Sequence, residues 1–157
     1  MKNKFFVRII ILVSVSLVCT LSGCHGSSPQ YDPRLMVADS LLRENNPDSA
    51  LQVLSAINSA ALRNASDQAY YALLLTQAQY RCYVDIKSDS TINVALDYYK
   101  RHDGEQEKLT RCYIYKGAVT EVLDDPETAM TYYKQAVNVA SPDDHFNQGT
   151  SEHGSGT

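Results

Sequence analysis

The sequence predicts an all-α domain, built as a solenoid of about three helix-turn-helix units that follow a signal peptide. Three observations lead to this prediction. Apolar residues recur at helical spacing throughout residues 33–141, and no stretch shows the alternation that is typical of strands. The motif at residues 95–100 returns 34 residues later, at residues 129–134. Two helix starts, at residues 46–51 and 125–130, also share the same chemistry.

The internal repeat divides the chain into similar units. Residues 95–100 read Ala-Leu-Asp-Tyr-Tyr-Lys, and residues 129–134 read Ala-Met-Thr-Tyr-Tyr-Lys. A fixed period of this length indicates stacked supersecondary units, each of which buries its apolar face against a neighbour. A further helical stretch precedes each of the aligned helices. The predicted units are therefore residues 33–59, 66–102 and 103–141.

The two similar helix starts have a clear physical basis. Asn46 and Asp125 are residue types that accept hydrogen bonds from the free backbone N–H groups of a first helical turn. A proline follows each of them and fits the first helical position. The next residue is acidic in both cases, which complements the positive end of the helix dipole. The acidic cluster at residues 124–127 is therefore interpreted as a helix start and not as a metal site.

Small residues recur where the two helices of a unit approach each other. Ala38 and Ala50 are twelve residues apart, and so are Gly117 and Ala129. This spacing, together with the 34-residue period, resembles the tetratricopeptide repeat family, whose unit is two antiparallel helices with small residues at these two positions. The family's positions for larger or apolar residues are matched by Leu54, Tyr99, Tyr133, Ile57 and Ala136. The middle unit departs from the pattern, because about five extra residues within residues 84–90 lengthen its turn.

The tyrosine pairs of the second helices invite two interpretations. A carbohydrate-stacking surface is one of them. The favoured interpretation is that Tyr99 and Tyr133 fill the seam between paired helices, while Tyr98 and Tyr132 lie half-exposed beside them.

The family resemblance also implies a concave groove lined by the first helix of each unit. Such a groove suits an extended peptide or a helix of a partner protein. The positions carried over from the family are Asp39, Leu42, Arg43, Gln79, Cys82, Tyr83, Arg111, Ile114 and Glu121.

Residues 1–23 have the organisation of a lipoprotein signal peptide. Three cations and no acid accompany an apolar run at residues 9–18, which is shorter than the roughly 20 residues of a membrane span. Residues 21–24, Leu-Ser-Gly-Cys, resemble the lipobox of bacterial lipoproteins. The resemblance implies cleavage before Cys24 and attachment of acyl chains to Cys24, which would provide stable anchoring.

The expected location is the cell envelope, with the domain facing the periplasm. The outer membrane is favoured, because His25 follows the lipidated residue in place of an acidic residue of the kind that retains some lipoproteins in the inner membrane. The polar residues 24–32 are expected to be a flexible tether.

Residues 143–146 look like the start of a further helix, but residues 149–157 have no apolar periodicity and contain three glycines, so a disordered or truncated tail is expected at residues 142–157. Without a capping helix, the face around Tyr132, Ala136 and Val139 should be partly uncovered and should promote self-association.

Composition and spacing exclude several functions. Removal of residues 1–23 takes away three cations, so the formal net charge changes from −4 to −7, which argues against nucleic-acid binding. Cys82 and Cys112 have no further ligand at metal-binding spacing, so no zinc site is predicted, and packed thiols are favoured over a disulfide. No catalytic arrangement and no phosphate-binding loop is recognisable, so neither enzymatic activity nor a cofactor is expected.

The first functional hypothesis is a lipid-anchored, non-catalytic module that binds a protein or peptide partner. The second is that the chain is the N-terminal fragment of a longer repeat-containing membrane sensor or transcriptional regulator. The third, a glycan-uptake lipoprotein of the outer membrane, is disfavoured because such proteins have far longer chains with large loop insertions.

Overall fold

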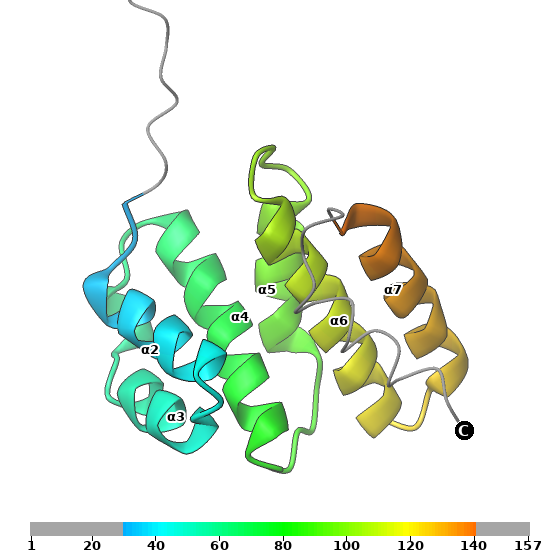
Figure 1. Cartoon of the computed structure of the whole chain (residues 1–157), viewed down its shortest axis with the longest axis horizontal. Coiled ribbons are helices and arrows are strands. Elements are labelled where there is room, and N and C mark those ends of the chain that lie inside the picture. Colours follow the sequence, from blue (N-terminus) through cyan, green and yellow to red (C-terminus); the bar gives the residue numbers. More distant parts are fainter. Residues whose placement is uncertain (1–29, 141–157) are drawn as a thin grey trace, which may run out of the picture. The chain divides into compact units, whose positions relative to one another are not determined.

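Six α-helices follow one another between residues 30 and 140, which is the part of the chain that the computed structural model describes (Figure 1). No strand occurs within these residues, so the predicted all-α class is confirmed. The predictions for the signal peptide, for Cys24 and for the tail at 142–157 lie outside the described residues. The elements are α2 (Pro33–Arg43), α3 (Pro47–Ser55), the short 3₁₀-helix η2 (Ser59–Ala61), α4 (Ala65–Arg81), α5 (Ser90–Tyr99), α6 (Gln106–Val122) and α7 (Pro126–Val139).

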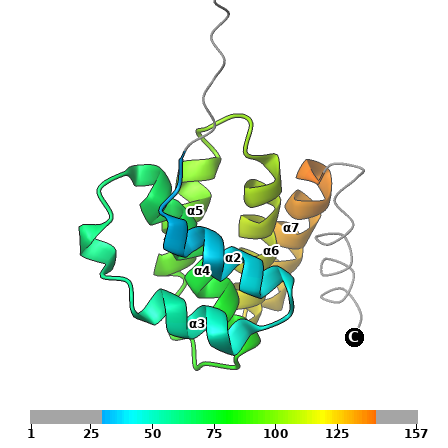
Figure 2. The same cartoon turned by 60° about the vertical axis from the view of Figure 1, so that its left-hand side comes forward.

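The helices pack in sequential pairs, α2 with α3, α4 with α5 and α6 with α7. Each pair also contacts the next one, because α3 packs on α4 and α5 packs on α6. In addition, α4 contacts both α2 and α6, so the first helices of the three pairs follow one another across the domain (Figure 1). In Figure 2, the pair α2–α3 lies in front of α4. The predicted pairing of consecutive helices is confirmed.

The predicted helix caps are present at the starts of α3 and α7. The side chain of Asn46 accepts a hydrogen bond from the backbone N–H of Ser49, and that of Asp125 accepts one from Thr128, at 3.4 and 3.1 Å. A third cap, which was not predicted, is present at the start of α2, where Asp32 accepts a hydrogen bond from the backbone N–H of Arg34 at 2.9 Å and a proline follows. Three helices thus begin with a side-chain cap followed by a proline, although α2 has no acidic residue in its first turn.

The ends of α2, α4 and α6 are also alike. Each helix is followed by a residue with positive φ: Asn45 at 61°, Tyr83 at 55° and Asp124 at 68°. The next backbone N–H then returns to a carbonyl of the last turn, as in the Schellman motif. The three bonds run from Asn46 to Leu41, from Val84 to Gln79 and from Asp125 to Thr120. Each of these helices therefore ends in a left-handed turn of the same kind.

The tyrosine pairs lie as predicted. Tyr99 and Tyr133 are buried between helices, whereas Tyr98 and Tyr132 are half-buried beside them. The middle pair also has the predicted longer connection, because α4 ends at Arg81 and α5 begins only at Ser90.

The prediction of an uncovered face on the last helix is wrong at its centre. Ala136 has no exposed surface, because this side of α7 packs against the hydrophobic core, and only Tyr132 and Val139 are partly exposed. The outward positions of α7 include the polar Thr131 and Lys134 and also Val137, an apolar residue that is 59% exposed.

Helices α6 and α7 approach each other closely at Gly117. A Cβ atom at this position would lie 2.7 Å from Cε1 of Tyr133, which is well inside van der Waals contact. The Tyr133 ring cannot move away freely, because its hydroxyl donates a hydrogen bond to Glu121 at 2.9 Å. The absence of a side chain at Gly117 therefore allows the close packing of this pair.

We predict that Gly117→Ala destabilises the protein. Alanine gains about 1 kcal/mol over glycine within a helix, but overpacking a core typically costs about 1–3 kcal/mol. The free energy of unfolding, measured by urea denaturation, should therefore fall by about 1 kcal/mol. In a Tyr133→Ala background the ring is absent, and the same substitution should instead stabilise the protein. A stabilising effect in the wild-type background would contradict the packing argument.

Candidate interaction surface

The groove residues predicted from the sequence separate into a buried and an exposed set. The buried set consists of Asp39, Leu42, Arg111 and Ile114. Arg43, Tyr83 and Glu121 are exposed, and Gln79 and Cys82 are partly exposed. The buried residues pack between helices and present no side chain to a partner. Only the second set contributes to the surface.

Arg111 of α6 is the centre of a buried ionic cluster, with 1% of its surface exposed. Its Nη1 lies 2.7 Å from Oδ1 of Asp39 on α2 and 3.3 Å from Oε1 of Glu107. Its Nη2 donates a hydrogen bond to Oε1 of Gln77 on α4. A single guanidinium group therefore joins α2, α4 and α6.

Arg43 extends this cluster to the surface. Its Nε donates to Oδ2 of Asp39 at 2.9 Å, and its Nη2 contacts Glu107. Burial alone would raise the pKa of Asp39, but the charge of Arg111 and the hydrogen bonds from both arginines hold this pKa below its usual value. Asp39 therefore remains ionised between its two cationic partners.

A second buried cation links α6 to its other neighbours. The Lys116 ammonium contacts the carboxylate of Asp89, which precedes α5, and lies 2.7 Å from Oδ1 of Asn93. It also lies 5.4 Å from the centre of the Tyr132 ring on α7. Helix α6 thus makes polar contacts with all the helices that surround it.

We predict that Asp39→Asn strongly destabilises the fold, because it leaves the buried charge of Arg111 without its main counter-ion. Removing one partner of a buried pair typically costs about 3–5 kcal/mol. The half-exposed Glu107 is the matched control, and Glu107→Gln should cost at most about 1 kcal/mol. Urea denaturation at neutral pH measures both, and equal effects would contradict a buried ionic centre.

Comparison of the wild type with Asp39→Asn also tests how the free energy of unfolding depends on pH. The pKa of Asp39 is lower in the folded protein than in the unfolded chain, so its contribution is complete above about pH 4 and is lost as the pH falls toward the folded value. The Asp39→Asn variant should therefore lose less stability than the wild type over that acidic range.

The exposed Tyr83 borders a hollow at the far end of α4. This hollow has a volume of about 770 Å³ and lies between the α2–α3 turn, the α4–α5 loop and the end of α6. Its lining residues are Asn45, Pro47, Tyr80, Arg81, Tyr83, Val84, Asp85, Ile86 and Val122. Four of them, Tyr80, Tyr83, Val84 and Val122, are large apolar side chains with considerable exposure. We define this feature as the end hollow.

Tyr83 adopts an unfavourable backbone conformation at the rim of the end hollow. Its φ of 55° lies in the left-handed region, which Asn and Asp tolerate and a bulky residue disfavours. No packing compensates this strain, because 96% of the side chain is exposed. Asn45 and Asp124 occupy the corresponding turns at lower cost.

We predict that Tyr83→Asn stabilises the protein by about 0.5–1 kcal/mol, because asparagine enters the left-handed region more readily and no buried contact is lost. Thermal or urea unfolding measures the gain. Tyr83→Phe is the matched control, since it keeps both the ring and the strain and should leave stability unchanged. A loss of stability in Tyr83→Asn would contradict the strain argument.

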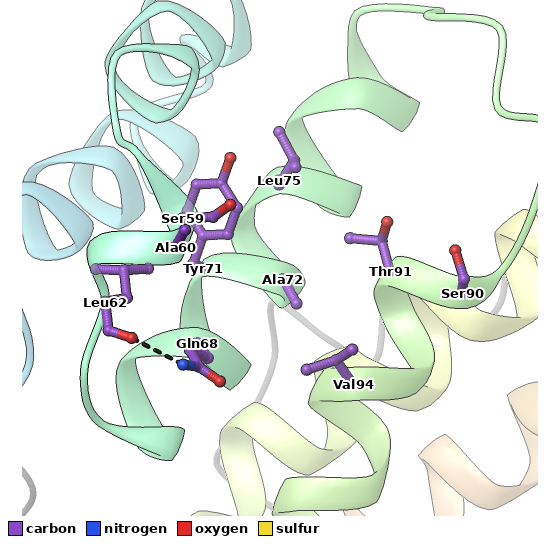
Figure 3. A pocket seen from close by; sticks show the side chains of 10 residues that line it. All are labelled: Ser59, Ala60, Leu62, Gln68, Tyr71, Ala72, Leu75, Ser90, Thr91 and Val94. Atoms are coloured by element: carbon purple, nitrogen blue, oxygen red, sulfur yellow. Dashed lines mark hydrogen bonds between the residues drawn. The ribbon is translucent and has the colours of Figure 1, made fainter.

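A second hollow lies between η2, α4 and α5 and has a volume of about 540 Å³. Figure 3 shows Tyr71 and Leu75 of α4 facing it, together with Thr91 and Val94 of α5. All its lining residues are uncharged, and the hydrogen bond from Gln68 Nε2 to the carbonyl of Leu62, 2.7 Å long, closes one side. The polar groups of this hollow are the side-chain amide of Gln68 and the hydroxyls of serine, threonine and tyrosine, and no carboxylate, histidine or cysteine lines it.

Within residues 30–140, no three metal-ligating side chains cluster as a metal site would require. Cys82 and Cys112 are free thiols, and burial raises the pKa of the Cys112 thiol. None of the helices in this part of the chain combines the length and the apolar composition that a membrane span needs.

The comparisons give no family assignment. No family model matches the chain, and neither the curated proteins nor the solved structures provide a match. The all-helical fold is therefore described from its own geometry.

Proposed function

We propose that this chain is a lipid-anchored, non-catalytic module of the tetratricopeptide-repeat type, which binds a protein or peptide partner in the cell envelope. The repeat character is supported by the three sequential helix pairs and by the contacts of α4 with both α2 and α6. It is also supported by the shared helix ends at Asn45, Tyr83 and Asp124 and by the close approach at Gly117.

The end hollow is the observation that carries a binding function. Large apolar side chains are normally scattered singly over a protein surface, whereas contiguous ones mark interaction sites. Tyr83, Val84 and Val122 come from two different helix ends and line the same depression. The end hollow exposes apolar side chains, and the described residues show no cluster of side chains typical of an active site. Binding of a partner is therefore the function that the surface supports best.

The proposed anchor would hold the domain near the membrane. Near the start of the described residues, the Tyr31 hydroxyl donates a hydrogen bond to Oε1 of Glu105, which precedes α6, at 2.8 Å. The backbone N–H of Asp32 donates to Oδ1 of Asp67 in the first turn of α4, at 2.9 Å. The distance from Cys24 to Tyr31 is at most about 25 Å in a fully extended chain. Lipidation of Cys24 would therefore keep the domain close to the bilayer.

We predict that Cys24→Ala prevents lipid modification, because only the Cys24 thiol follows the lipobox-like residues 21–23. Metabolic labelling with a fatty acid, followed by membrane fractionation, measures the modification. Cys19→Ala, within the signal peptide, is the matched control and should be labelled like the wild type. Labelling of Cys24→Ala at the wild-type level would exclude the proposed anchor.

A further inference from the structure

The edge of the domain around the end hollow is strongly acidic. It contains the ends of α2, α4 and α6 and the turns that follow them, at the bottom of Figure 1. Its acidic residues are Glu44, Asp48, Asp85, Glu121, Asp124 and Asp125. Among the described residues, only Asp85 of this set forms an ion pair, with Lys87 at 2.5 Å. The other five carboxylates are not neutralised by a neighbouring cation.

The cations at this edge are already engaged within the domain. Arg81 donates one hydrogen bond to the carbonyl of Leu42, at 2.7 Å, and another to the side chain of Asn45. Arg43 is held by Asp39 and Glu107. The edge therefore presents excess negative charge to any approaching molecule.

Some of these carboxylates lie directly against the apolar surface. Asp85 is itself a lining residue of the end hollow, and Glu121 immediately precedes the lining residue Val122. Burial and the charge of Glu121 together raise the pKa of Tyr80, another lining residue. The side chain of Asp48 approaches the Cys82 thiol at the end of α4, where burial and this contact raise the thiol pKa. Apolar and acidic groups are thus interleaved over one small area.

We propose that the end hollow binds a segment of a partner protein in which lysine or arginine side chains alternate with apolar ones. The apolar side chains would pack among Tyr83, Val84 and Val122, and the cations would meet the rim carboxylates that form no ion pair within the described residues. This inference specifies the partner chemistry of the proposed binding module and rests on that proposed function. Charge complementarity of this kind supplies specificity and a fast association rate.

Two other occupants fit this surface less well. Two copies of the chain that met through the same edge would bring like charges together, since a two-fold interface places the same patch on both sides. Membrane surfaces rich in anionic lipids repel carboxylates. The edge also lies at the opposite end of α4 from the contacts of Tyr31 and Asp32, which pack against Tyr70 and Asp67 near the start of that helix.

The test uses the full chain in a neutral detergent and a fluorescein-labelled peptide in which lysine and leucine alternate. The control peptide carries glutamate in place of every lysine. Fluorescence anisotropy should show binding of the basic peptide only, and added salt should weaken this binding. Sedimentation of the protein alone, over a concentration series, reports whether a second copy occupies the surface.

Variants locate the binding site without disrupting the fold. Tyr83→Asn should weaken binding of the basic peptide about tenfold or more while raising the melting temperature, which separates lost contact from lost folding. The double variant Glu44→Gln/Asp124→Asn should weaken binding similarly, and asparagine suits the left-handed position of residue 124. Val137→Ser and Asp97→Asn, exposed residues away from the hollow, should bind like the wild type.

Equal binding of the basic and acidic peptides would overturn the proposal, as would unchanged binding in Tyr83→Asn. Self-association that is lost in Tyr83→Asn would overturn it in favour of a second copy as occupant. The outcome is separate from that of the lipid anchor. Peptide binding by a chain that carries no lipid would refute only the anchor, and a lipidated chain that binds no basic peptide would refute only this inference.

Discussion

The arrangement of the six helices depends on one buried cation. The Arg111 guanidinium is almost completely removed from water, and a charge in such a position is stable only when it is paired and hydrogen-bonded. Its partners Asp39 and Gln77 belong to α2 and α4, whereas Arg111 itself belongs to α6. These three helices therefore cannot slide or rotate independently without exposing or unpairing the charge. The remaining helices, α3, α5 and α7, each pack onto this framework.

The same three helices also determine the surface at their far ends. Because α2, α4 and α6 are fixed relative to one another, the turns that follow them are brought together around the end hollow. All three turns use a left-handed residue, but only the middle one carries a large aromatic side chain there. Asn45 and Asp124 show that a left-handed turn of this kind forms without an aromatic side chain. Under the proposed binding function, the strain at Tyr83 is the cost of presenting an aromatic surface, which stability alone would not favour.

Local features of this fold were predictable from sequence, and long-range ones were not. The caps at Asn46 and Asp125 were predictable because the acceptor, the proline and the acidic residue are contiguous in the chain, and the helix pairs followed from the 34-residue period. The role of Arg111 was not, because its partner Asp39 is 72 residues away and charged residues on a helix face are normally solvated. The end hollow was missed for a related reason. It exists only where three separate helix ends meet, and of its lining residues only Tyr83 is among the groove positions that the family resemblance implies.

The distribution of charge connects the proposed anchor with the proposed binding surface. Much of the negative charge lies around the turns after α2, α4 and α6, whereas the contacts of Tyr31 and Asp32 are at the other end of α4. Helix α4 has 17 residues and is about 25 Å long, which is several Debye lengths at physiological salt. Anionic headgroups near the N-terminal side would therefore scarcely affect the acidic edge. Attachment at Cys24 and binding of a basic partner at the end hollow are thus spatially and electrostatically compatible, so the proposed anchor and the proposed binding site could be occupied at the same time.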